Sequence, residues 1–225
     1  MLVAIHQLHY LPWLRYFEKI GRADAFIVLD DVQFAKNDWQ NRNKIKTAQG
    51  ATVLTLPVEQ KHQQPLNEVR INNRVNWRRK HWETLRQAYG SAPFFAEMAV
   101  YFESVYSKSW ERMNDLNREM LGFFLRVLDM ETPIHYSSEL GMPGEATERL
   151  INLIKAVGGT RYYSGKYALQ VYLDERQLTD AGIGLELQRW TAPVYEQLHG
   201  EFIPDLSIVD LLFNHGPEAR RILMG

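Results

Sequence analysis

The chain has 225 residues, of which 26 are basic and 27 acidic, so its formal net charge is −1. This balance gives no overall field that would attract nucleic acid or an anionic membrane, and neither is expected as a partner. The absence of cysteine excludes disulfides, thiolate zinc sites and cysteine nucleophiles. No basic leader and no run of about 18 apolar residues is present, so we expect a cytoplasmic protein.

The first thirty residues predict a strand–helix–strand unit. Residues 3–5 and 25–29 are short β-rich runs, and the apolar residues of 12–22 are spaced for one helix face. Such a unit implies two parallel strands with a right-handed crossover. His6, Gln7 and Tyr10 follow the first strand, where open α/β sheets bind ligands. The alternative is an ordinary loop with aromatic core residues.

Two segments after this unit are candidates for ligand contacts. Asp31 closes the second predicted strand, where it could bind a metal or a hydroxyl group or simply form a turn. Residues 34–46 contain cations, asparagines and a tryptophan with almost no aliphatic side chain. We expect a loop that grips an anionic, hydroxyl-rich ligand through Lys36, Asn41, Arg42 and Asn43, although a solvated loop has the same composition.

The rest of the chain predicts an α/β protein. Strands are expected at 52–57 and 69–71, with a polar turn at 60–65, and helices at 77–88, 94–106 and 109–128. Alternation then resumes with strands at 134–136, 161–163 and 184–188 and helices at 146–157 and 171–181. This order predicts a single α/β domain over 1–225, with a mainly parallel Rossmann-like sheet, helices on both faces and a helical insertion at about 76–130.

A second candidate site lies where the strand at 161–163 ends. Ser164 and Gly165 would expose a hydroxyl and backbone N–H groups there, and Lys166 adds a positive charge, a combination that suits phosphate or carboxylate. The spacing is not that of a Walker A loop, and an ordinary turn explains it equally well.

Two further polar clusters are singled out. Lys80 and His81 belong to a basic run between two tryptophans, a pattern of nucleic-acid surfaces that an anion or a partner acid explains better in a neutral protein. The polar C-terminal segment could form a second wall of the site through Tyr195, Gln197, Asp210 and Asn214; the last two are four residues apart on a helix predicted to start after Ser207.

Several reaction classes lack their motifs. His6 and His9 are three residues apart, but no third ligand completes a zinc site, so no metal is expected. No Gly-x-Ser-x-Gly elbow indicates a serine nucleophile.

Motifs along nearly the whole chain resemble the WbqC-like family. They are Ile5-His6-Gln7 with Tyr10-Leu11-Pro12-Trp13 and Tyr16-Phe17, Leu29-Asp30-Asp31-Val32-Gln33-Phe34, Asn41-Arg42-Asn43, Trp77 with Lys80-His81, Tyr163-Ser164-Gly165, Pro193 with Tyr195 and Gln197, and Leu206-Ser207 with Asp210-Leu211-Leu212-Phe213-Asn214. The chain departs from the family pattern at Leu8, Arg15 and 167–170.

The resemblance implies a role in bacterial surface-glycan assembly, such as O-antigen biosynthesis. It implies a cytoplasmic transferase that adds an amino-acid or acyl group to an amino sugar linked to a nucleotide, with an unknown cofactor. His6 would be the general base, His81 a second catalytic residue, and Arg42, Lys36 and Lys166 would hold phosphate or carboxylate. The alternatives are a nucleotidyltransferase with paired histidines and a non-catalytic scaffold protein of the glycan machinery.

Overall fold

A computed structural model describes residues 1–35, 38–59 and 63–225. Their contacts divide them into two compact units. Unit 1 comprises residues 1–7, 16–31 and 131–191, and unit 2 comprises 8–15, 32–130 and 192–225. The chain therefore leaves unit 1 after each of its first two strands and returns to it.

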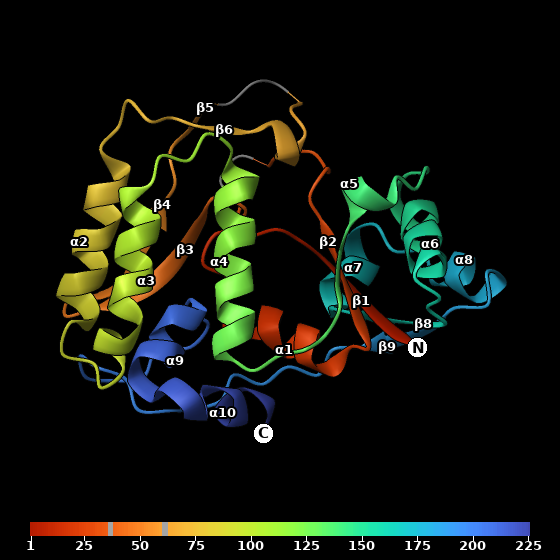
Figure 1. Cartoon of the computed structure of the whole chain (residues 1–225). Coiled ribbons are helices and arrows are strands. Elements are labelled where there is room, and N and C mark those ends of the chain that lie inside the picture. Colours follow the sequence, from red (N-terminus) through yellow and green to blue (C-terminus); the bar gives the residue numbers. More distant parts are fainter. Residues whose placement is uncertain (36–37, 60–62) are drawn as a thin grey trace. The chain divides into compact units, whose positions relative to one another are not determined.

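Unit 1 contains a five-stranded parallel sheet, which confirms the predicted Rossmann-like α/β fold (Figure 1). Its strands are β1 (Leu2–Gln7), β2 (Ala25–Leu29), β7 (Ile134–Tyr136), β8 (Arg161–Ser164) and β9 (Gly184–Leu187). They lie in the order β7-β2-β1-β8-β9, with parallel pairing throughout. Counted along the chain this is 3-2-1-4-5, so the order reverses between β1 and β8.

Helices cover both faces of the sheet, because alternate strand residues point to opposite sides. On one face Val3, Ile5 and Tyr162 pack with Leu153 of α6 and Leu178 of α8. On the other face α1 places the ring of Tyr16 5.3 Å from that of Phe26. The helices of this unit are α1 (Leu14–Arg22, from Tyr16 onward), α5 (Ser137–Leu140), α6 (Ala146–Ala156), α7 (Lys166–Val171) and α8 (Glu175–Asp180).

The helix predicted at 171–181 is confirmed from Glu175 to Asp180 as α8 and is wrong before that, since α7 ends at Val171. Asp174 interrupts the helix, because its side chain accepts hydrogen bonds from the backbone N–H groups of Arg176 and Gln177 at 2.9 and 3.3 Å. An aspartate that caps a new helix competes with continuation of the old one.

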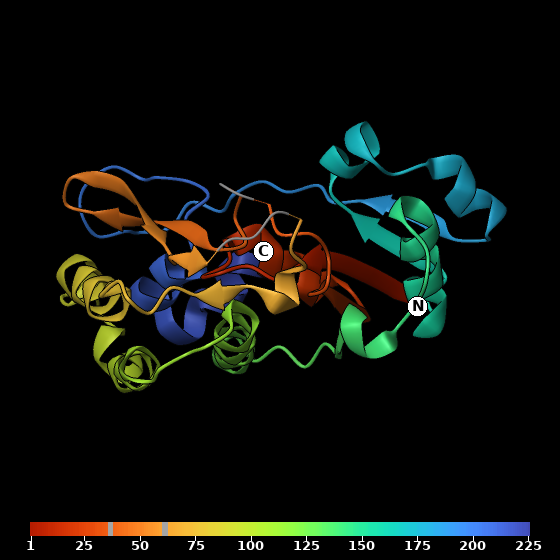
Figure 2. The same cartoon turned by 90° about the horizontal axis from the view of Figure 1, so that it is seen from above.

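Unit 2 combines two small antiparallel sheets with helices. α2, α3 and α4 stand side by side in Figure 1 and are seen end-on in Figure 2. The elements are β3 (Arg42–Thr47), β4 (Gly50–Thr55), β5 (Val58–Glu59), β6 (Arg70–Ile71), the 3-10 helix η1 (Leu66–Glu68), α2 (Trp77–Tyr89), α3 (Phe95–Ser107), α4 (Met113–Val127), α9 (Ile208–His215), η2 (Gly216–Glu218) and α10 (Ala219–Met224). The three helices predicted between 77 and 128 are confirmed.

Aromatic rings form the centre of unit 2. The ring of Phe213 on α9 lies 5.1 to 5.3 Å from those of Tyr89, Phe95 and Phe102. The chain turns after α9 at Gly216, whose φ of 47° is in the left-handed region, and a β-carbon there would strike the ring of Phe94. Glycine is therefore required at this turn.

The loop predicted over 34–46 is wrong in its second half, because 42–47 form β3. β3 pairs with β4, and β5 pairs with β6, so the runs at 52–57 and 69–71 do not pair with each other. The strand was missed because one of its inward positions is Asn43, a polar residue buried by a hydrogen bond from its amide to the Leu11 carbonyl at 2.7 Å. Part of the predicted turn at 60–65 lies outside the described residues.

The single domain predicted over 1–225 stays a prediction. The helices of the predicted insertion belong to unit 2, which takes up the chain between β2 and β7. Among the described residues, none of the helices combines the length and the apolar character needed to cross a membrane.

Candidate functional site

The carboxyl edge of the parallel sheet gathers the polar residues of unit 1. β1 ends in His6 and Gln7, and its neighbour β8 ends in Ser164, followed by Gly165. The strand order reverses between these two strands, so their crossover connections run in opposite directions. In open α/β sheets, ligands bind at this point of reversal. The topology therefore brings His6, Gln7, Ser164 and Gly165 to the ligand-binding position of this fold class.

The geometry of His6 fixes its tautomer. Its Nδ1 lies 3.3 Å from the carbonyl oxygen of Gln7, which can only accept a hydrogen bond, so Nδ1 carries the proton. The ring packs edge-on against Tyr16 at 5.2 Å between ring centres. In the neutral ring this contact leaves Nε2 unprotonated, as a general base requires.

A buried network on α1 was missed by sequence reasoning. Glu18 is 5% exposed and accepts hydrogen bonds from the Tyr163 hydroxyl at 3.1 Å, Gln188 Nε2 at 2.6 Å and Arg22 Nε at 3.2 Å. Burial, and then the neighbouring Glu18 carboxylate, raise the pKa of Tyr163 well above its usual value, so this hydroxyl stays a donor. The network ties α1 to β8 and to the residue after β9.

Lys19, the neighbour of Glu18, is also buried, with 6% of its surface exposed. Its Nζ lies 4.0 Å from the point that a β-carbon on Gly165 would occupy. A sequence signal existed: Glu18 and Lys19 stand between Phe17 and Ile20, in a nine-residue helix that buries all four. Two charged residues inside an apolar stretch of a helix indicate a functional position more than a solvated face.

The turn after β8 carries the predicted anion-binding residues. Ser164 is 1% exposed, and its hydroxyl donates a long hydrogen bond of 3.4 Å to the carbonyl of Gly165. Lys166 is exposed at the start of α7. Their substrate-binding role stays a prediction.

Asp31 belongs to a hydrogen-bond network at the end of β2. Its carboxylate accepts hydrogen bonds from Arg149 Nη2 at 2.5 Å and from the Ser137 hydroxyl at 2.6 Å. The adjacent Asp30 accepts from the backbone N–H and the hydroxyl of Ser138 at 3.0 and 2.8 Å. These bonds join β2 to α5 and α6, and the substrate contact predicted for Asp31 would compete with Arg149.

In unit 2, Tyr10 and His81 form a buried chain with Tyr106. The Tyr10 hydroxyl lies 2.8 Å from His81 Nδ1 and 2.6 Å from the Tyr106 hydroxyl. Burial lowers the pKa of His81 to about 4. A backbone hydrogen bond with Thr55 raises this pKa, and the positive charge of the exposed Lys80 lowers it further. His81 is therefore neutral near pH 7. Its catalytic role stays a prediction, and this burial favours a positioning role.

We expect His81 to make the protein sensitive to mild acid. The histidine of the unfolded chain binds a proton below about pH 6.5, whereas the folded protein resists protonation until about pH 4. Stability should therefore fall as pH drops through this window, by up to about 3 kcal/mol from this residue. Urea unfolding of wild type and His81→Gln at pH 7 and pH 4.5 checks this. An equal loss in both proteins would contradict it.

Asp210 is the centre of a second buried network in unit 2. Its two carboxylate oxygens accept hydrogen bonds from Tyr89 and Tyr195, each at 2.9 Å. The Tyr89 hydroxyl in turn accepts from the backbone N–H of Lys46 at 2.9 Å. The buried Lys46 ammonium donates to the carbonyls of Gly200 and Glu201 at 3.2 and 2.6 Å. Burial raises the pKa of Asp210 despite these donors.

Other predicted site residues of unit 2 bond to the backbone. The side-chain amides of Asn41, Asn43, Gln197 and Asn214 donate to the carbonyls of Leu56, Leu11, Ile203 and Asp210, respectively. These bonds shape loops and a helix turn, and they explain the polar content of the segments without a ligand. Their substrate-binding role stays a prediction.

A surface patch of cations and indoles includes Arg42. Its guanidinium lies 5.8 Å from the ring centre of Trp39, as does the ammonium of Lys44. Trp39 meets Trp13 at 5.1 Å, and Arg15 lies 4.9 Å from the Trp13 ring. Three cations held against two rings form a positive surface on unit 2 that fits the anionic ligand predicted for Arg42. Lys36, predicted to bind with it, lies outside the described residues.

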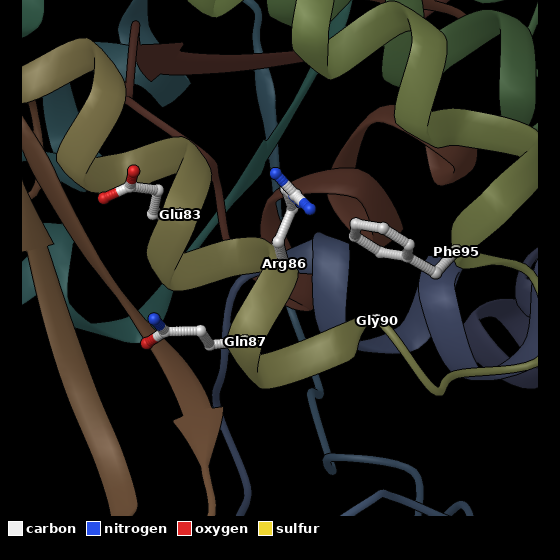
Figure 3. Close-up of a pocket in the computed structure, with 5 residues that line it drawn as sticks. All are labelled: Glu83, Arg86, Gln87, Gly90 and Phe95. Atoms are coloured by element: carbon white, nitrogen blue, oxygen red, sulfur yellow. The ribbon is translucent and has the colours of Figure 1, made fainter.

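A pocket of 460 Å³ lies elsewhere in unit 2, between α2 and the start of α3 (Figure 3). Glu83, Arg86 and Gln87 line it from α2, together with Gly90 and Phe95. Glu83 is engaged by Arg79 at 2.7 Å. None of the residues singled out from the sequence lines this pocket. Within the described ranges, no group of three His, Asp or Glu side chains is placed to hold a metal ion.

From the sequence we expect the site residues to converge in one cleft, and these residues come from both units. His6 and Ser164 belong to unit 1, while Tyr10, Arg42, His81 and Asn214 belong to unit 2. This convergence stays a prediction.

Comparison with known proteins identifies the family. The model of the WbqC-like protein family matches residues 7–222, which cover most of both units. The chain belongs to the WbqC-like protein family. A relative from Mycobacterium tuberculosis, named "Uncharacterized protein Rv1507c", is 38% identical over 221 residues, which cover 96% of this chain and 95% of the relative. No solved structure matches the chain.

Membership confirms the resemblance drawn from the motifs. The match includes Gln7, the Asn41-Arg42-Asn43 run and the turn at Ser164 and Gly165, and it extends past Asn214. The relative's name assigns it no activity, so the chemistry of this WbqC-like protein has to be argued from its own side chains.

Proposed function

We propose that this WbqC-like protein is a group transferase of bacterial surface-glycan assembly, which moves an amino-acid or acyl group onto an amino sugar carried by a nucleotide. The observation that carries the proposal is the position of His6, near the end of β1 at the strand reversal of a Rossmann-like sheet, on the strand beside Ser164 and Gly165. Family membership supports the glycan context.

The proposed reaction needs one base. The amine of the sugar attacks the carbonyl carbon of an activated acyl donor, a C–N bond forms, and the bond from carbon to the leaving group breaks. His6 Nε2 takes the proton that the amine loses, and the leaving group departs with the electron pair of the broken bond. The Nδ1–H bond to Gln7 holds the ring in the required tautomer.

The test is a transfer assay with defined partners. The purified protein is incubated with a UDP-linked amino sugar and labelled aminoacyl or acyl donors, and the products are identified by mass spectrometry. An amide-linked product supports the proposal. Release of pyrophosphate from ATP and magnesium, without acyl transfer, would favour the nucleotidyltransferase. Tight binding of the sugar nucleotide without turnover of any donor would favour the scaffold protein. Cytoplasmic location stays a prediction.

Arg42 is expected to grip an anionic part of the substrate. Arg42→Lys should weaken binding of UDP-N-acetylglucosamine about tenfold, because a bidentate fork is replaced by a single ammonium. Calorimetry at two salt concentrations measures this. Lys44→Arg on the same strand is the control and should bind at least as well as wild type. Unchanged affinity of Arg42→Lys, or no salt dependence, would leave Arg42 as a surface cation.

A further inference from the structure

The small sheet of β3 and β4 has one face that carries positive side chains and no negative ones. Alternate residues of a strand point to the same side, so Arg42 and Lys44 share this face. Their partners across the sheet are Thr55 and Val53, which are exposed and uncharged. Neither strand contains an acidic residue. The sheet itself therefore supplies no carboxylate that could offset the two cations.

The indole of Trp39 is the common neighbour of both cations. The guanidinium carbon of Arg42 and the ammonium of Lys44 each lie 5.8 Å from its ring centre. Trp13 is only 8% exposed and packs edge-on against Trp39, with 5.1 Å between ring centres and 77° between the planes. Trp39 itself is partly exposed. A buried tryptophan thus supports a flat ring that stands at the surface beside two positive charges.

Two groups of this cluster keep their capacity to donate hydrogen bonds. The Lys44 ammonium forms no ion pair or hydrogen bond within the described ranges, and the indole N–H of Trp39 donates to no acceptor there. A comparable pair elsewhere in unit 2 differs. Lys108 lies 5.9 Å from the ring centre of Trp110, but the indole N–H of Trp110 donates to the Val105 carbonyl at 2.8 Å. Trp110 therefore has a structural hydrogen bond that Trp39 lacks.

We propose that Trp39 stacks on the base of a nucleoside diphosphate, while Lys44 and Arg42 bind its phosphates. Bases stack on exposed indoles, and neighbouring lysine and arginine side chains attract the phosphates. At 5.8 Å from the ring centre each cation is still attracted to the indole, and its N–H groups can donate to a phosphate oxygen. This inference rests on the proposed function, since it names the nucleotide of the sugar nucleotide as the part that these side chains hold.

The experiment separates the ring from the charge. Trp39→Leu removes the flat ring, Trp39→Phe keeps a smaller one, and Lys44→Gln removes a charge. Binding of UDP, inorganic pyrophosphate and N-acetylglucosamine 1-phosphate is measured by calorimetry. We expect Trp39→Leu to weaken UDP binding about tenfold and to leave pyrophosphate binding unchanged, because only UDP carries a base. Trp39→Phe should retain most of the UDP affinity, and Lys44→Gln should weaken binding of UDP and pyrophosphate alike.

Lys108→Gln is the matched control, because Lys108 is an exposed lysine beside another tryptophan of the same unit. This variant should bind UDP as wild type does. Circular dichroism shows whether each variant keeps its fold. If Trp39→Leu does not fold, Trp39→Phe still tests the stacking through fluorescence, excited beyond the absorption of uracil. UDP should quench part of the tryptophan emission of wild type, and this part should be missing in Trp39→Phe.

The outcomes separate this inference from the transferase. Equal UDP affinity in wild type and folded Trp39→Leu overturns the inference, as does a wild-type protein that does not bind UDP. Binding of N-acetylglucosamine 1-phosphate that depends on Trp39, without binding of UDP, assigns the ring to a sugar and also overturns it. UDP binding that Trp39→Leu and Lys44→Gln both lose, in a protein that transfers no acyl group, supports the inference and overturns the proposed reaction.

Discussion

Asp210→Ala is expected to destabilise the protein by about 3–5 kcal/mol. The change removes the acceptor of two tyrosine hydroxyls, those of Tyr89 and Tyr195, in a place where Asp210 itself is 0% exposed. Each buried hydroxyl left without an acceptor costs about 1–3 kcal/mol, and the cavity adds to this. The free energy of unfolding in urea, followed by tryptophan fluorescence, measures the loss.

Two variants bracket this expectation. Tyr195→Phe removes one of the two hydrogen bonds and should cost about 1 kcal/mol. Asp180→Ala changes an aspartate whose side chain is 72% exposed and should leave the free energy of unfolding unchanged within about 0.5 kcal/mol. If Asp210→Ala unfolded at the same urea concentration as wild type, the network would have no structural role.

His6→Ala is expected to reduce the rate of acyl transfer by about 10²- to 10⁴-fold, the range that a general base contributes. The melting temperature should change little, because His6 is only partly buried near the end of β1. Single-turnover kinetics of wild type and variant measure the rate, and thermal unfolding is recorded beside it.

His135 provides the matched control for His6. It lies on β7 of the same sheet, is also partly buried, and pairs with Ile27 of β2 away from the strand reversal. His135→Ala should retain the transfer rate. A folded His6→Ala protein with full activity would remove His6 from catalysis, and equal loss of stability in both variants would make His6 a packing residue.

Periodicity alone was sufficient for the parallel sheet and for the helices of the insertion. The alternation from 3–5 to 25–29, and its return at 134–136, predicted strands that do pair in parallel. The apolar spacing between 77 and 128 predicted α2, α3 and α4. Both signals are strong because burial of one helix face, or of whole strands, requires many apolar residues at regular intervals.

The sequence did not predict where polar side chains are buried or cap a helix. β3 was missed because Asn43 occupies an inward position. Its side chain is held there by a hydrogen bond to the carbonyl of Leu11, which is 32 positions away in the sequence. The break between α7 and α8 depended on whether Asp174 would cap a helix or sit within one. Whether a polar residue is buried or caps a helix depends on its hydrogen-bond partners, and the local sequence pattern does not show which partners it finds.

The sequence by itself determined the family through its motifs, the α/β class through its periodicity, and the polar residues at the ends of β1 and β8. Only the tertiary structure decided that His6 and Ser164 end adjacent strands at the reversal of strand order, that Lys19 reaches Gly165, and that Asp210 and His81 are enclosed in buried networks. The physical reason is that periodicity records which residues are buried, whereas strand order and hydrogen bonds between distant residues determine which polar groups meet.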